Sequence, residues 1–233
     1  MNMKPSRTGP GRGLLVAGTV MAGLALSGCA VQNKTATSEY GIDAEVSALS
    51  VTTKGGNIEV VPGDGTGAHV TEKIRYADDK PRTEHSVRDG RLTLTAPSCH
   101  DCGIDYTVSV PRGTTLTLDT EGGNITVRQI DGAMAARTGG GNVRVTDTAP
   151  KSLSARTDGG NIEATLTKPP TTLTAQTGGG NVTVTLPRTP YAVDASTSGG
   201  RSDISVPTDP SSPHHVTIRT GGGNIDVNQT PSS

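Results

Sequence analysis

The stretch Leu153-Ser-Ala-Arg-Thr-Asp-Gly-Gly-Asn-Ile-Glu-Ala-Thr-Leu166 contains the pattern that decides the fold. At its centre, Gly-Gly-Asn follows a threonine two residues upstream and precedes an isoleucine. Six copies of this Thr-x-Gly-Gly-Asn-Ile/Val pattern occur, and from Thr120 onward they and one degenerate copy at Thr197 follow at steps of 18, 19, 20, 20 and 23 residues. A period near twenty residues indicates stacked repeats. The asparagines of the six copies are Asn57, Asn124, Asn142, Asn161, Asn181 and Asn224.

Apolar residues alternate with polar ones on both sides of each Gly-Gly-Asn. In the stretch above, Leu153 and Ala155 precede the turn, and Ile162, Ala164 and Leu166 follow it. Alternation with a period of two indicates strands that bury one face. We therefore predict an all-β fold, a parallel β-solenoid with coils of about 20 residues, each made of strand, Gly-Gly-Asn turn, strand and second turn.

The residue types of the turn suggest two further expectations. Glycine and asparagine tolerate a positive φ, and we expect the tight turns to require it. Stacking places equivalent residues about 4.8 Å apart, so the six asparagines are predicted to form a structural ladder of side-chain amide hydrogen bonds. The degenerate copy carries Arg201 in place of asparagine; we expect its coil to stay in register and its arginine to break the ladder there.

The segment 62–114, between the first and second copies, has a different pattern. Its candidate strands alternate in hydropathy but lack Gly-Gly-Asn turns, and polar turns separate them. We predict an antiparallel excursion that leaves the solenoid near its N-terminal end and returns at Leu116. The candidate strands are Val70–Tyr76, Arg91–Ala96 and Ile104–Val110.

The N-terminus is typical of an exported lipoprotein. A basic start precedes an apolar stretch from Leu14 to Leu26, which is too short for a bilayer span of roughly 20 residues and fits a secretory signal. The sequence Leu26-Ser-Gly-Cys29 resembles a bacterial lipobox, in which the cysteine becomes the lipid-modified first residue. The alternative is an ordinary signal peptide followed by an accidental cysteine. We predict a signal peptide at 1–28 and lipidation of Cys29.

Acyl chains on Cys29 would hold the protein at a membrane, because each buried CH₂ contributes about 0.8 kcal/mol and two chains anchor stably. We expect residues 29–44 to form the lipidated cysteine and a tether, 45–228 a single solenoid domain, and 229–233 a tail. The predicted location is the outer face of the bacterial cytoplasmic membrane, with the membrane itself as one partner through the anchor.

Charge and composition limit both the possible partners and the make-up of the core. Removing the signal peptide takes three of the 21 Lys and Arg residues, so 18 remain against 22 Asp and Glu, a net charge of about −4. This charge argues against a nucleic-acid partner, which needs a basic surface. The chain has no Phe or Trp and only four Tyr, so its core must be built from aliphatic residues and threonine.

The segment Ile104-Asp-Tyr-Thr-Val-Ser-Val-Pro111, followed by Leu116 to Thr120 and the Gly-Gly-Asn repeats, resembles the DUF4097 family of β-strand-repeat proteins, also described as adhesin-like. The resemblance covers roughly residues 45–228. It implies a β-solenoid on the bacterial cell surface, serving as an interaction or scaffold module of the envelope. An envelope glycan or a surface protein is the candidate partner. Some relatives occur alongside envelope-stress systems, which gives one alternative role.

The most compact reactive group is Cys99-His-Asp-Cys102. After export these two cysteines, besides Cys29, lie in an oxidising compartment, which favours a disulfide between Cys99 and Cys102. A thioredoxin-like redox pair would need a helix N-terminus to lower the thiol pKa, and no helix is expected. A metal half-site that includes His100 would need two more ligands, for which His69 or His85 could fold nearby. The sequence requires neither, so we predict no metal and no cofactor.

A β-helix enzyme acting on glycans is the other alternative class. Such enzymes usually need clustered carboxylates. The candidate acids on successive coils are dispersed, and the chain lacks the aromatic residues that often stack on sugars, so we expect no catalysis. Convergence of the first three acids in a groove would favour the enzyme. The candidate acids are Glu121, Asp158, Glu163 and Asp226.

Overall fold

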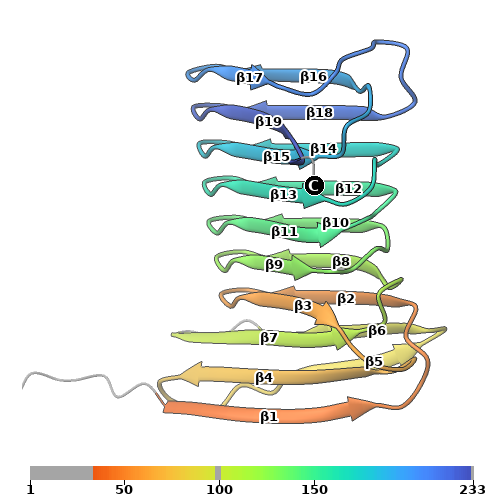
Figure 1. Ribbon diagram of the computed structural model, residues 1–233. Coiled ribbons are helices and arrows are strands. Elements are labelled where there is room, and N and C mark those ends of the chain that lie inside the picture. Colours follow the sequence, from red (N-terminus) through yellow and green to blue (C-terminus); the bar gives the residue numbers. More distant parts are fainter. Residues whose placement is uncertain (1–33, 98–100, 232–233) are drawn as a thin grey trace, which may run out of the picture. The chain divides into compact units, whose positions relative to one another are not determined.

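The computed structural model describes residues 34–97 and 101–231, which belong to one unit spanning 32–233. The described residues form two sheets (Figure 1). Sheet A has the order β1 (Lys34–Ile42), β4 (Ala68–Tyr76), β7 (Cys102–Val110), β3 (Ile58–Pro62), β9 (Ile125–Arg128), β11 (Val143–Thr148), β13 (Ile162–Leu166), β15 (Val182–Leu186), β19 (Ile225–Gln229) and β17 (Ser202–Ile204). Sheet B has the order β16 (Ala192–Thr197), β18 (His215–Thr220), β14 (Thr172–Thr177), β12 (Ser152–Thr157), β10 (Met134–Thr138), β8 (Thr115–Thr120), β2 (Ala48–Thr53), β6 (Arg91–Thr95) and β5 (Glu84–Arg88).

Each Gly-Gly-Asn repeat forms one coil, with its first strand in sheet B and its second in sheet A. Equivalent strands of neighbouring coils are parallel and in register: Leu153 lies opposite Met134 on one side and Leu173 on the other. The prediction of an all-β, parallel solenoid with antiparallel strands near its N-terminal end is confirmed. No segment within 34–97 or 101–231 forms a helix long and apolar enough to cross a membrane.

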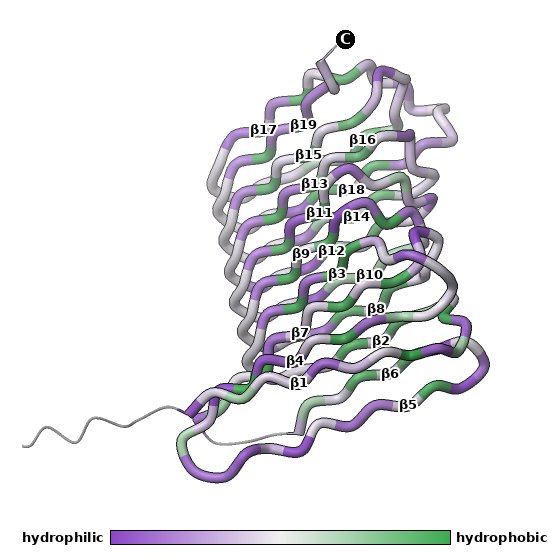
Figure 2. Tube along the Cα trace, turned by 60° about the horizontal axis from the view of Figure 1, so that its bottom comes forward, coloured by the Kyte–Doolittle hydropathy of each residue, from purple (hydrophilic) through white to green (hydrophobic). Residues whose placement is uncertain are grey.

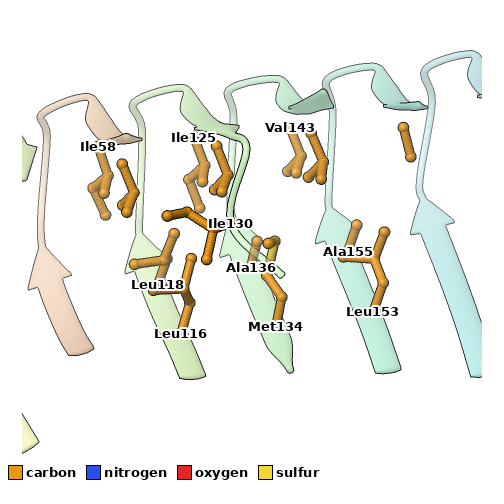
Figure 3. Close-up of a cluster of buried hydrophobic side chains, with 14 of the residues drawn as sticks. Ile58, Leu116, Leu118, Ile125, Ile130, Met134, Ala136, Val143, Leu153 and Ala155 are labelled. Atoms are coloured by element: carbon orange, nitrogen blue, oxygen red, sulfur yellow. The ribbon is translucent and has the colours of Figure 1, made fainter. Parts of the chain in front are cut away.

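The core lies between the sheets, where the alternating apolar side chains of successive coils meet. Figure 2 shows this alternation along the chain, and Figure 3 shows Leu116, Ile125 and their neighbours pointing into the space between strands. Both residues are at most 1% exposed. Burying one such aliphatic side chain stabilises the fold by about 1.5–3 kcal/mol. Thin layers of aliphatic residues therefore supply the core without Phe or Trp.

The glycines of the turns serve a purpose different from the predicted one. The only glycines with positive φ in the described residues are Gly65 and Gly90, and no asparagine of the repeats has positive φ. The prediction of left-handed turns at Gly-Gly-Asn is therefore wrong. A Cβ on Gly160 would instead lie 2.0 Å from the carbonyl oxygen of Gly141 in the neighbouring coil. Glycine is needed before each asparagine because the coils approach too closely there for a side chain.

The segment 62–114 extends the stack instead of leaving it. β4 pairs antiparallel with β7, and β5 with β6, as the predicted excursion requires. However, β6 pairs in parallel with β2 and β7 with β3, so these two strands form one more coil beneath the first repeat. β1, β4 and β5 then close that end. The predicted tether at 29–44 also needs correction, because residues 34–42 form β1, which pairs with β4.

The last two coils are stacked in an order opposite to their order in the sequence. β18 and β19, the C-terminal coil, lie between β14–β15 and β16–β17 (Figure 1). The degenerate coil with Arg201 is therefore the end of the stack. It remains in register with its neighbour, since Val193 lies opposite Val216 and Ser202 opposite Ile225.

Candidate interaction surfaces

The turn asparagines form a continuous column along one edge of the stack. The side-chain oxygen Oδ1 of Asn142 accepts a hydrogen bond from the backbone N–H of Asn161 at 2.8 Å, and Asn161 accepts in the same way from Asn181 at 2.8 Å. The first rungs add an amide-to-amide bond, as from Nδ2 of Asn124 to Oδ1 of Asn57 at 3.2 Å. Each carboxamide therefore accepts a hydrogen bond from a backbone N–H of the next coil. Strand pairing alone would leave this N–H unpaired at the turn.

The threonine upstream of each Gly-Gly-Asn connects two coils from inside the turn. The Thr157 hydroxyl donates to the Gly141 carbonyl of the previous coil at 2.7 Å and accepts from the Gly160 N–H of its own turn at 3.1 Å. Thr157 is 1% exposed. A buried hydroxyl is tolerated because it both donates and accepts. The threonine, glycine and asparagine of the pattern thus act together as a structural unit.

Different residues close the two ends of the asparagine column. At the N-terminal end, Oδ1 of Asp105 accepts from the backbone N–H of Asn57 at 2.8 Å, and Arg75 donates to Oδ2 of Asp105 at 2.5 Å. At the other end, the Arg201 N–H donates to Oδ1 of Asn224 at 3.1 Å. Arginine offers no side-chain acceptor, and none is needed where no coil follows. Arg201 therefore ends the ladder instead of breaking it, and sequence reasoning missed both roles because they depend on which coil lies at each end of the stack.

A buried polar cluster lies inside the N-terminal end. Glu72 on β4 is 2% exposed although it occupies a core position between Val70 and Ile74. Its two carboxylate oxygens accept hydrogen bonds from the hydroxyls of Tyr40 and Thr83, both at 2.7 Å. These bonds connect β1 and the segment before β5 to β4. The cluster compensates for burying the charge, which would otherwise be costly.

The tyrosines beside Glu72 have perturbed acidities. Burial is the largest cause that raises the pKa of Tyr40, and the hydrogen bond with Glu72 raises it further. Burial and the nearby charge of Glu72 raise the pKa of Tyr106, whose hydroxyl is buried without a hydrogen-bond partner among the described residues. At the opposite end of the stack, burial raises the pKa of Tyr191 to about 12.

The acids that would favour an enzyme lie in different rows of the stack or in coils that are not neighbours. Glu121 and Asp158 are turn residues two coils apart, whereas Glu163 projects from the outer face of β13. Glu121 forms an ion pair with Lys54, and Glu163 with Arg144 at 2.8 Å. Asp226 lies on β19, 3.6 Å from the Arg201 guanidinium. The structure does not bring Glu121, Asp158 and Glu163 together in one groove.

The predicted disulfide and metal alternatives are only partly within the described residues. Cys102 begins β7, but Cys99 and His100 lie outside the described residues, so the disulfide remains a prediction. His69 lies on β4, and His85 stacks on Tyr40 with ring centroids 4.6 Å apart. Within 34–97 and 101–231, no three His, Cys, Asp or Glu side chains are arranged to hold a metal ion. Cys29 also lies outside the described residues.

Comparisons with known proteins identify the architecture. A family model described as Toastrack DUF4097 matches residues 43–230. A "putative cell adhesion protein" from Clostridium sporogenes is 13% identical, with 85% of this chain and 100% of that chain covered and a TM-score of 0.51. A "putative adhesin" from Bacteroides fragilis is 16% identical, with 83% and 97% covered and a TM-score of 0.41. No curated protein matches the chain.

Proposed function

Because the chain belongs to the Toastrack DUF4097 family, we propose that it is an adhesin-like interaction module on the bacterial cell surface. The observation that carries this proposal is the pair of long outer faces of sheets A and B. Their strands place exposed polar side chains in regular rows, as on β12, where Ser152, Ser154 and Arg156 all face solvent. Solenoids use such extended surfaces for binding. The description of the C. sporogenes neighbour as a "putative cell adhesion protein" agrees with this role.

We further propose that the module is exported and anchored through a lipid on Cys29. Support comes from the apolar stretch 14–26 and the Leu26-Ser-Gly-Cys29 sequence. The proposed partner is an envelope glycan or a surface protein. A disulfide between Cys99 and Cys102 is proposed to close the turn before β7. Catalysis is not proposed, because Glu121 and Glu163 are in separate ion pairs.

Capture from fractionated envelope tests the interaction role. Residues 30–233, immobilised and shown by circular dichroism to be folded, are incubated separately with peptidoglycan, membranes, surface proteins and soluble glycans. We expect saturable capture of one fraction and competition by free protein. Folded protein that captures none of these fractions would contradict the proposal and favour a scaffold or stress-linked role.

The anchor is tested separately in cells. Cys29→Ser should release the protein into the medium or leave its signal peptide uncleaved, and incorporation of a labelled fatty acid should disappear. Undiminished membrane association through acyl chains in this variant would contradict lipidation of Cys29.

A further inference from the structure

Two arginines lie side by side on the outer face of sheet B. Arg137 on β10 and Arg156 on β12 are direct register partners on adjacent parallel strands, and both are exposed. Their side chains therefore leave the sheet about 4.8 Å apart. Like charges directly opposite each other on neighbouring strands are destabilising. The fold alone gives no reason for this pair.

Other arginines on the coil strands are neutralised by neighbouring acids. Arg128 lies 2.9 Å from Glu59, Arg144 lies 2.8 Å from Glu163, and Arg219 forms an ion pair with Asp194. These are the remaining arginines of strands β8 to β19. Within the described part of the chain, neither Arg137 nor Arg156 forms an ion pair with a carboxylate. Asp119 is the register partner of Arg137 on its other side, but no ion pair joins their side chains, so both guanidinium groups remain free to bind an anion.

A neutral side chain orients Arg156. The Nη2 group of Arg156 donates a hydrogen bond to Oε1 of Gln176, the next residue along the same row. A glutamate at this position would neutralise the guanidinium, whereas the amide accepts a hydrogen bond and leaves the charge unchanged. Gln176 is thus a positioning residue that preserves the charge of Arg156.

A shallow hollow of about 300 Å³ lies beside the two arginines. Ala135 forms part of its floor, and its short side chain leaves space between the register neighbours Thr117 and Ser154. Asp119, the neighbour of Arg137 in the row, also lines the hollow. Hydroxyls and one carboxylate can bind sugar hydroxyls, while paired guanidinium groups suit an oxyanion.

We propose that this hollow binds an acidic glycan, with Arg137 and Arg156 holding its carboxylate or phosphate group. Thr117, Ser154 and Asp119 contact the hydroxyls of the sugar ring that carries the charge. The proposal rests on the interaction role proposed above and assigns a ligand class and a site to it. The local charge pair attracts the ligand although the chain as a whole is acidic.

Titration of the folded protein with defined sugars tests the site. The probes are a galacturonate oligomer and glucose 1-phosphate, and a neutral glucose oligomer is the control. Binding is measured by calorimetry and by amide NMR shifts at β10 and β12. We expect binding of at least one charged probe, weaker at high salt, and no binding of the neutral oligomer. Which charged probe binds distinguishes a carboxylate from a phosphate ligand. Failure of both charged probes would overturn the proposal.

Matched variants separate this site from general charge effects. Arg137→Gln, Arg156→Gln and Gln176→Glu should each weaken binding by at least about tenfold with little change in melting temperature. Arg144→Gln removes one positive charge from sheet A and should leave the affinity unchanged. Equal losses in Arg144→Gln, or retained binding in Arg156→Gln, would overturn the proposal.

The two proposals can fail independently. Capture of an envelope fraction that survives Arg137→Gln and Arg156→Gln, without binding of the charged sugars, would overturn the glycan site and leave the interaction role standing. Binding of the charged sugars through these arginines, without capture of any fraction, would support the site and contradict the proposed cell-surface role.

Discussion

At the residue scale, the glycine directly before each asparagine determines how closely two coils approach. The glycine carbonyl accepts a hydrogen bond from the threonine hydroxyl of the next coil, as the Gly141 carbonyl does from Thr157 at 2.7 Å. A Cβ on the next glycine, Gly160, would lie 2.0 Å from the same oxygen. The short hydrogen bond from threonine and the requirement for glycine therefore have the same cause, which is the close approach of two coils.

Two adjacent glycines provide a matched test of this contact. Gly160→Ala should destabilise the fold by about 3 kcal/mol, because the added Cβ overlaps backbone that cannot move without separating the coils. In Gly159→Ala the added Cβ would have no atom within 4 Å, so the free energy of unfolding should change by less than about 0.5 kcal/mol. Urea unfolding of both variants measures the difference. Similar stabilities would show that the coils are not in close contact at this point.

The asparagine column predicts a smaller and position-dependent effect. Asn161→Ala leaves the Asn181 N–H without its acceptor and should cost about 0.5–1.5 kcal/mol. Arg201→Ala occupies the equivalent turn position in the last coil, where its side chain accepts nothing, and should cost less than about 0.5 kcal/mol. Thermal unfolding compares the two. An Arg201→Ala effect as large as that of Asn161→Ala would contradict the assigned end of the column.

The Thr-x-Gly-Gly-Asn pattern was visible in the sequence, but its physical cause was not. Glycine next to asparagine is common where φ is positive, so a left-handed turn was the natural expectation. Close approach between coils depends on a carbonyl from another repeat, such as Gly141 above Gly160. Likewise, Arg137 and Arg156 are 19 residues apart, and only the register of β10 and β12 makes them neighbours.

At the element scale, the N-terminal end is closed by strands of opposite direction instead of another coil. β1 pairs with β4, and the Tyr40–Glu72 bond joins the side chains of these two strands. Alternation along β4 predicted that strand, yet Glu72 occupies an inward position where the pattern calls for an apolar residue. Its partners Tyr40 and Thr83 lie in segments that were expected to be tether and turn. Sequence reasoning therefore could not find this cluster.

Two tyrosines at the N-terminal end, Tyr40 on β1 and Tyr106 on β7, should respond differently to loss of their hydroxyls. Tyr40→Phe removes a hydrogen bond to a charged carboxylate and should cost about 1.5–3 kcal/mol. Tyr106→Phe removes a buried hydroxyl that has no partner among the described residues, and should leave stability unchanged or raise it. Denaturant unfolding compares both variants with the unsubstituted protein. A loss above about 1 kcal/mol for Tyr106→Phe would indicate a bound water as the missing partner.

At the scale of the whole solenoid, the period predicted the coils but could not predict their order. Sequence order would place the degenerate coil next to β14–β15 and the C-terminal coil at the end. In that arrangement Arg201 would provide no acceptor for the Asn224 N–H, and one rung would be lost. In the observed order each of the six asparagines accepts from a following coil, and Arg201 needs only to donate. The residue that breaks the repeat pattern therefore belongs at the end of the stack.

Hydrogen exchange should reveal this inverted order. Amides of β18 and β19 hydrogen-bond to strands on both sides, so they should be protected nearly as well as those of β9 and β11 at the centre. Amides of β16 and β17 lie at the edge of the described stack, where Ile204 is 39% exposed, and should exchange faster by at least about tenfold. If β19 exchanged faster than β17, the coils would be stacked in sequence order. Slow exchange throughout β16 and β17 would instead mean that another chain covers this end.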